Sequence, residues 1–220
     1  MSEKLRLRFV KEGRAVYISH LDLMRTMQRA FQRAGCRLKY SEGFNPHPII
    51  SILLPLSVGA SSECELMDFQ LTDDPDLEAL PTALTAAMPE GIRALEVYTE
   101  GRKVKELKWL RISGVLEYDT ADVDLMRDGL QRFFARPEIL IRKKTKRGEG
   151  ESDIAPAIRS IGFEAAERCV LLNAVISAQD PTLNPELLIS ALAQLTPELA
   201  PDFAEFRRLA VYDAAMKEFR

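Results

Sequence analysis

Apolar and polar positions follow two different periods along the first hundred residues. Residues 5–10 alternate between apolar and polar side chains, as in a half-buried strand, whereas apolar residues recur at helical spacing in residues 21–34. The same patterns predict further strands at 49–55, 63–71 and 92–99 and a second helix at 76–88. Strand, helix, strand, strand, helix, strand is the order of a split βαβ, or ferredoxin-like, unit.

The same order returns in the second half of the chain. The patterns predict strands at 110–118, 138–143, 169–178 and 206–212, with helices at 123–135 and 185–195. In the first of these helices we expect inward-facing side chains at Leu125, Met126, Leu130, Phe133 and Phe134. Residues 148–166 fit the repeat least well: within them, residues 153–161 fit either a short helix or an extra strand, and the pattern does not decide between the two.

These two halves define the predicted architecture. We expect an α+β protein of two ferredoxin-like (split βαβ) halves, each with an antiparallel sheet and helices on one face. The first half comprises residues 1–105 and carries the main motifs, and the second comprises residues 106–220 and carries a basic hairpin. The charged stretch 101–108 is the best candidate for a linker.

Composition and charge exclude several classes of function. A net charge of −3 gives no global attraction for nucleic acid, so any such binding requires a local basic patch. No apolar run is long enough to cross a bilayer, and the first residues lack the apolar stretch of a signal peptide, so we expect a cytoplasmic protein without membrane contact. The three cysteines are widely spaced and only two histidines are present, a composition that predicts no zinc or cluster site.

The helix at 21–34 begins with a capping signal and carries a row of arginines. Ser19 is a favoured N-cap residue, with Asp22 three positions later. Arg25, Arg29 and Arg33 follow at intervals of four, on the face opposite the apolar residues. The row is either a solvated helix face or a contact for phosphates or an acidic partner, because guanidinium groups suit planar anions.

The segment 40–48, with sequence YSEGFNPHP, concentrates unusual residues between two apolar runs. Pro46 and Pro48 restrict the backbone around them, and Gly43 permits conformations that other residues resist. The segment is either a well-shaped turn or a stiffened binding platform. In the second interpretation its contacts come from Tyr40, Ser41, Phe44, Asn45 and His47.

The densest basic run of the chain lies at 142–147. At a hairpin tip these cations could contact phosphates and release counterions, or could simply solubilise a loop. Split βαβ sheets often present surfaces for single-stranded RNA, although the aromatic signature of RNA-recognition motifs is missing here. The candidate contacts in this run are Lys143, Lys144, Lys146 and Arg147.

His20 and His47 are the only candidates for acid–base chemistry near neutral pH. With Ser19, Ser41 or Tyr40 nearby, a histidine pair could in principle cleave RNA. Nothing in the sequence brings the two rings within reach of each other, so both are weak candidates and we assign no catalytic residue.

The motifs taken together resemble the radical-SAM-linked protein family, bacterial proteins of unknown function. The resemblance covers about the first 70 residues most closely and rests on SHLDLMR at 19–25, YSEGFNPHP at 40–48, PLSVG at 55–59 and SSE at 61–63. A looser match runs from Lys144 to Ile154. The family implies a partner, a radical-SAM enzyme of the cobalamin-binding kind, present as a separate chain. That partner is expected to carry the Fe–S cluster, S-adenosylmethionine and cobalamin, with no cofactor bound by this chain.

Three functional hypotheses remain after these observations. The first is an accessory protein that binds an RNA substrate of tRNA or rRNA type and docks on the radical-SAM enzyme, using the helix, the 40–48 segment and the basic hairpin. The second is a stand-alone, metal-independent enzyme that processes or modifies RNA. The third is a protein–protein adaptor in which the arginine row binds an acidic surface.

Overall fold

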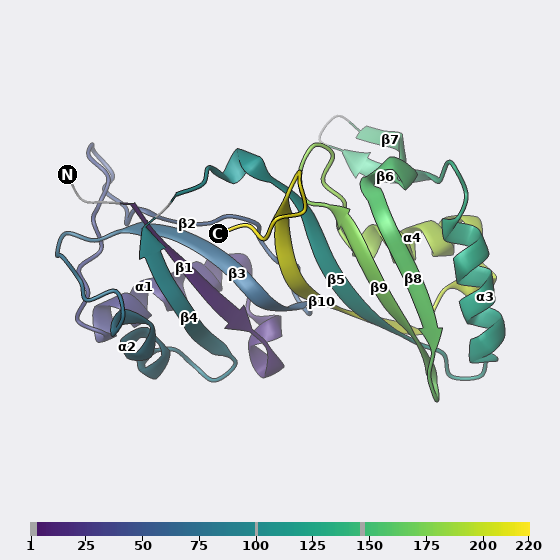
Figure 1. The fold of residues 1–220 in the computed structure, drawn as a ribbon, viewed down its shortest axis with the longest axis horizontal. Coiled ribbons are helices and arrows are strands. Elements are labelled where there is room, and N and C mark those ends of the chain that lie inside the picture. The colour runs from purple at the N-terminus through teal and green to yellow at the C-terminus, as the bar shows by residue number, and fades with distance from the viewer. Residues whose placement is uncertain (1–3, 100, 146–147) are drawn as a thin grey trace. The chain divides into compact units, whose positions relative to one another are not determined.

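The chain divides into two compact units in the computed structural model (Figure 1). The first comprises residues up to Glu106 together with Arg220, and the second comprises Leu107–Phe219. The structure describes residues 4–99, 101–145 and 148–220. Each unit is an α+β structure built on antiparallel strands.

The first unit has the strand order of a ferredoxin-like fold. Its sheet runs β4-β1-β3, with β2 pairing the outer side of β3, and every neighbouring pair is antiparallel. The predicted order of elements is therefore confirmed. The elements are β1 (Lys4–Lys11), the 3-10 helix η1 (Gly13–Tyr17), α1 (His20–Arg33), β2 (Ile50–Ile52), β3 (Ser61–Gln70), α2 (Leu80–Ala87), β4 (Ile92–Thr99) and η2 (Val104–Glu106).

Both helices of this unit pack on one face of the sheet. The alternating apolar side chains of β1 contribute Leu7 and Phe9, which are fully buried beneath α1 and α2. From α1, Phe31 meets Phe69 of β3 with ring centroids 4.8 Å apart. The apolar residues that alternate along the strands and those that recur at helical spacing are thus buried in the same core.

The opposite face of β1 carries a buried ion pair. Arg6 has no exposed side-chain surface, and its Nε and Nη2 donate to the two carboxylate oxygens of Asp68 at 2.6 and 3.1 Å. Lys4 Nζ lies 3.0 Å from the same carboxylate, but its side chain is 43% exposed. Asp68 therefore joins one buried and one partly exposed cation.

The second unit repeats the topology with an insertion. Its sheet runs β10-β5-β9-β8 and is antiparallel throughout. Between α3 and β8 the chain adds the separate two-stranded sheet β6-β7. The elements are β5 (Leu107–Glu117), α3 (Val123–Phe134), β6 (Leu140–Thr145), β7 (Gly148–Asp153), η3 (Ala155–Ala157), β8 (Ile158–Ala165), β9 (Cys169–Ser177), α4 (Glu186–Leu195), η4 (Pro197–Leu199) and β10 (Phe203–Asp213).

The insertion alters the role of the strand predicted at 138–143. That segment forms β6 of the hairpin and not the second strand of the main sheet, a place that β8 takes instead. The ambiguous residues 148–166 contain β7, η3 and β8. The Asp153 carboxylate ends the hairpin by accepting the backbone N–H groups of Ile139 and Ala155 at 2.9 and 3.0 Å.

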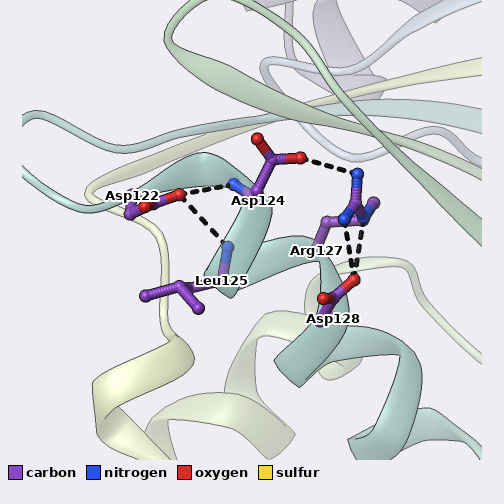
Figure 2. A network of polar contacts seen from close by, with 5 residues as sticks. All are labelled: Asp122, Asp124, Leu125, Arg127 and Asp128. Carbon is purple, nitrogen blue, oxygen red and sulfur yellow. Dashed lines mark hydrogen bonds and ion pairs between the residues drawn. The ribbon is translucent and has the colours of Figure 1, made fainter.

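Helix α3 begins at an aspartate cap (Figure 2). Asp122 accepts the N–H groups of Asp124 and Leu125, while Arg127 pairs with Asp124 and Asp128 at 2.7 and 2.9 Å. The side chain of Leu125 is 61% exposed, so its predicted inward orientation is wrong. At about 100° per residue, nine residues place Leu125 on the side of the helix opposite the buried Phe134.

Candidate functional site

The N-terminus of α1 holds a small polar network. The Ser19 hydroxyl donates to the Asp22 carboxylate at 2.7 Å and accepts the Asp22 N–H at 3.2 Å, as expected for an N-cap. Arg25 donates to the other oxygen of the same carboxylate at 3.1 Å. The Ser19 hydroxyl and then Arg25 lower the pKa of Asp22, so it is a fixed anion beside the exposed His20.

A buried lysine holds the entry to this helix in place. Lys11, at the end of β1, is 1% exposed, and its Nζ donates to the carbonyls of Val16 and Ile18 at 3.0 and 3.3 Å. Burial lowers the pKa of Lys11, while the buried Glu65 acts in the opposite direction. The residue pattern does not indicate this role, because a lysine at a strand end usually lies in solvent.

The three arginines of α1 have different surroundings. Arg25 is paired with Asp22, whereas Arg33 donates to the carbonyl of Ala87 at the end of α2. Arg33 thus caps the last turn of a neighbouring helix. Arg29 is exposed, and its charge contributes to the lowered pKa of Asp22. Arg29 is consequently better placed than Arg25 or Arg33 to meet an anion.

The segment 40–48 is a hydrogen-bonded loop. Ser41 N–H donates to the His47 carbonyl at 2.9 Å, and the Ser41 hydroxyl accepts His47 N–H at 3.1 Å. The same hydroxyl lies 2.9 Å from His47 Nδ1, which also lies 3.3 Å from the Asn45 carbonyl. Gly43 has a φ of +120°, a conformation that suits glycine. The loop is closed on itself by polar contacts and contains Pro46 within the turn.

This closed loop exposes its aromatic side chains. Phe44 has a relative exposure of 112%, and Tyr40 is 55% exposed. Exposed apolar side chains that form a contiguous patch commonly mark a binding surface, whereas single exposed ones are normal. The platform interpretation therefore has a geometric basis: a closed backbone with Phe44 at its surface.

The two main motifs lie at opposite ends of the first sheet. Lys11 Nζ joins the His20 region to one end of β1, whereas Lys39 N–H donates to Gln70, which pairs with Lys4 at the other end. The eight residues of β1 span about 23 Å. His20 and His47 are thus not brought together, so a histidine pair acting on one bond finds no support in this geometry.

The basic hairpin is partly neutralised by its own second strand. Arg142 lies 3.8 Å from Glu151, and the backbone of Lys144 pairs with that of Glu149 in the register. Lys143, by contrast, is opposite Gly150. The predicted contacts Lys146 and Arg147 lie outside the described residues.

The backbone of β6 meets a side chain of α4 along its outer edge. Gln194 Oε1 accepts the N–H of Arg142 at 2.8 Å, and its Nε2 donates to the carbonyl of the same residue at 3.1 Å. A second bond from Nε2 to the Ser190 hydroxyl at 2.9 Å fixes the amide. One side chain thus completes both backbone bonds of a strand residue.

Neither a metal-binding cluster nor a membrane-spanning helix is found in the part of the chain that the structure describes. There, no group of three or more His, Cys, Asp or Glu side chains is arranged to hold a metal ion. No described helix combines the length and the apolar character needed to cross a membrane.

Comparison with solved structures finds distant similarity. One chain of a crystal structure of a Cbf5-Nop10-Gar1 complex aligns with 98% of this chain at a TM-score of 0.49 and 13% identity. This chain spans only 50% of that one. An unknown protein from Galdieria sulphuraria aligns over 94% of this chain and 99% of its own length, at a TM-score of 0.27 and 8% identity.

Comparison with protein families gives a direct assignment. No curated protein matches the chain. Residues 4–185 match a family described as an uncharacterized protein conserved in bacteria, DUF2344, and the match includes every motif residue discussed above. Since this region covers most of the 220 residues, the chain belongs to the DUF2344 family.

Proposed function

We propose that this chain is an accessory protein that binds an RNA of tRNA or rRNA type and docks on a radical-SAM enzyme. The observation that carries the proposal is the exposure of Phe44 on the closed loop 40–48. Single-stranded RNA is commonly bound by stacking its bases on such aromatic side chains. Tyr40 supplies a second ring on the same loop, and the polar groups of Asn45 and His47 can hydrogen-bond base edges.

Cations on both units support the RNA part of the proposal. Arg29 is an exposed guanidinium on α1, and Lys143 is a hairpin cation opposite a glycine and not a carboxylate. Such groups bind phosphate and release counterions, which makes affinity fall with salt. The overall charge of −3 confines this attraction to local patches.

Docking on the partner is assigned to the other end of the first sheet. Tyr17, Leu21 and Val58 are 73%, 67% and 57% exposed. The N–H of Gly59 donates to the Val16 carbonyl at 2.9 Å, which joins the Val58 loop to the segment before α1. In this proposal the enzyme covers these apolar side chains and contributes the Fe–S cluster, S-adenosylmethionine and cobalamin.

RNA binding is tested by fluorescence anisotropy with labelled single-stranded and structured RNA at two salt concentrations. We expect Phe44→Ser to weaken binding by about tenfold, because one base–aromatic stack is worth roughly 1–3 kcal/mol. Leu125→Ser is the control, since it removes an apolar side chain from α3 that is also solvent-exposed, at 61%. Arg29→Ala should reduce the slope of log affinity against log salt by about 0.7. Binding that is independent of salt and of Phe44 would refute the RNA part.

Docking is tested by co-purification with the radical-SAM enzyme. Leu21→Asp is expected to abolish co-purification, whereas Leu195→Asp, at an exposed position of α4, should leave it intact. If wild-type protein binds the enzyme but no RNA, the adaptor hypothesis replaces the proposal. If it binds RNA but no enzyme, the docking part fails alone.

A further inference from the structure

The sheet of the second unit has one face covered by helices and one face that is largely solvent-exposed. Along β5, Leu110, Ile112, Gly114 and Leu116 are buried, and the residues that alternate with them are half-buried or exposed. The buried face meets α3, where Phe134 stacks on Phe163 of β8 at 5.6 Å. Figure 1 shows β10, β5, β9 and β8 side by side, with α4 behind them. The exposed face is thus a continuous four-stranded surface.

Two aromatic residues lie next to each other at one end of this exposed face. Trp109 of β5 is directly opposite Tyr212 of β10 in the register, and both are half-buried. Ser177 of β9 flanks Trp109 on its other side. Neighbouring rings on an open split βαβ sheet are the arrangement on which RNA-binding sheets stack successive bases.

Two cations lie close to the Trp109 ring. The guanidinium of Arg159, an exposed residue of β8, lies 5.3 Å from the Trp109 ring centroid. Lys108 Nζ lies 5.9 Å from that centroid and is held there by the carbonyls of Gln179 and Asp180 at 3.0 and 2.8 Å. Arg111, two residues along β5 from Trp109, is exposed on the same face.

Three exposed carboxylates of this face lie at its other end. Glu117 is the last residue of β5, Glu205 is opposite Val115, and Glu164 of β8 is opposite Leu171 of β9. The Trp109 end therefore combines two aromatic rings with Lys108, Arg111 and Arg159 and one carboxylate, Glu218, which pairs with Tyr212, whereas the Glu117 end is acidic. A polyanion with stacking bases is complementary to the first end and is repelled by the second.

We infer that the Trp109 end of this sheet face is a binding site for single-stranded RNA. One base stacks on Trp109 and the next on Tyr212, and the phosphates between them contact Arg159 and Arg111. This inference rests on the proposed RNA binding and adds a site separate from the loop 40–48. It also assigns a role to the one tryptophan of the chain, which the family motifs do not include.

The single tryptophan allows a test without substitution. Unlabelled single-stranded octaribonucleotides are titrated into the full chain while Trp109 emission is recorded, and anisotropy of a labelled copy measures total binding in parallel. Stacking of a base on the indole should quench the emission with the same midpoint as the anisotropy change. The double variant Arg111→Glu/Arg159→Glu should weaken binding by tenfold or more and reduce the quench.

A charge-matched control separates this site from general electrostatics. Arg132→Glu/Arg168→Glu changes two exposed arginines outside the face and alters net charge equally. Quenching together with selective loss in the Arg111/Arg159 variant supports the inference. Binding with unchanged Trp109 emission, or equal loss in both variants, overturns it and leaves the loop 40–48 as the RNA site. No binding of any RNA overturns this inference and the RNA part of the proposed function together.

Discussion

We expect the two partners of the buried ion pair in the first unit to differ in how much unfolding free energy is lost when each is substituted. In Asp68→Asn the shape is retained but the charge is lost, and the fully buried Arg6 is left without its carboxylate. Arginine cannot release its proton in a protein, so its buried charge loses the carboxylate that neutralises it. Breaking a buried pair from one side costs about 3–5 kcal/mol of unfolding free energy, and we expect Asp68→Asn to fall in that range.

Arg6→Met should be milder. Asp68 keeps the ammonium of Lys4 at 3.0 Å, and Lys4 is partly exposed, so its own desolvation is small. A carboxylate can also take up a proton when burial disfavours its charge. We expect a loss of about 1–3 kcal/mol. The double variant Arg6→Met/Asp68→Leu should be close to the wild type, because apolar side chains can replace a buried pair.

Urea unfolding followed by far-ultraviolet circular dichroism measures all three variants. The slopes of the transitions must agree for the free energies to be compared. A loss of under about 1 kcal/mol for Asp68→Asn, or a larger loss for Arg6→Met than for Asp68→Asn, would refute the reasoning.

Two further predictions concern a close backbone contact and a buried phenol. Gly91 has a φ of +85°, and a Cβ added there would lie 2.3 Å from the Glu12 carbonyl oxygen. Gly91→Ala should therefore lower the unfolding free energy by about 1–3 kcal/mol. Gly162→Ala, where nothing lies within 4 Å of an added Cβ, should be nearly neutral in the same urea experiment. Burial raises the pKa of Tyr118 to about 12, and its hydroxyl donates to the Leu199 carbonyl at 2.9 Å. Its contribution to stability is complete below pH 10 and is lost as the pH rises toward 12, so Tyr118→Phe should flatten the fall in unfolding free energy over that interval. An equally steep fall in Tyr118→Phe would contradict this assignment.

The hydrophobic period was sufficient to predict the fold, because each half buries one face of its sheet under two helices. The period did not predict which strands pair with each other. The segment at 138–143 forms a strand as predicted, but that strand pairs only with β7 in a separate hairpin and not with the main sheet. The pattern could not reveal that β8 takes its place in the sheet, since strand partners are set by contacts distant in sequence.

The candidate site could be predicted only in part, again because some of its contacts join residues distant in sequence. The Ser19 cap and the turn around Gly43 follow from local chemistry, and the structure has both. The engagement of Arg33 with α2 and the burial of Lys11 depend on elements far along the chain. Cations in a sequence therefore do not indicate which of them are available to a ligand.

The amide of Gln194 has a consequence for the behaviour of the hairpin in concentrated solution. An unpaired strand edge can recruit a strand from another molecule and so begin aggregation. By bonding both backbone groups of Arg142, Gln194 blocks the middle of the β6 edge to such recruitment. Colloidal stability of the whole chain thus depends in part on one neutral side chain of α4, at a position where leucine would fit the helix equally well.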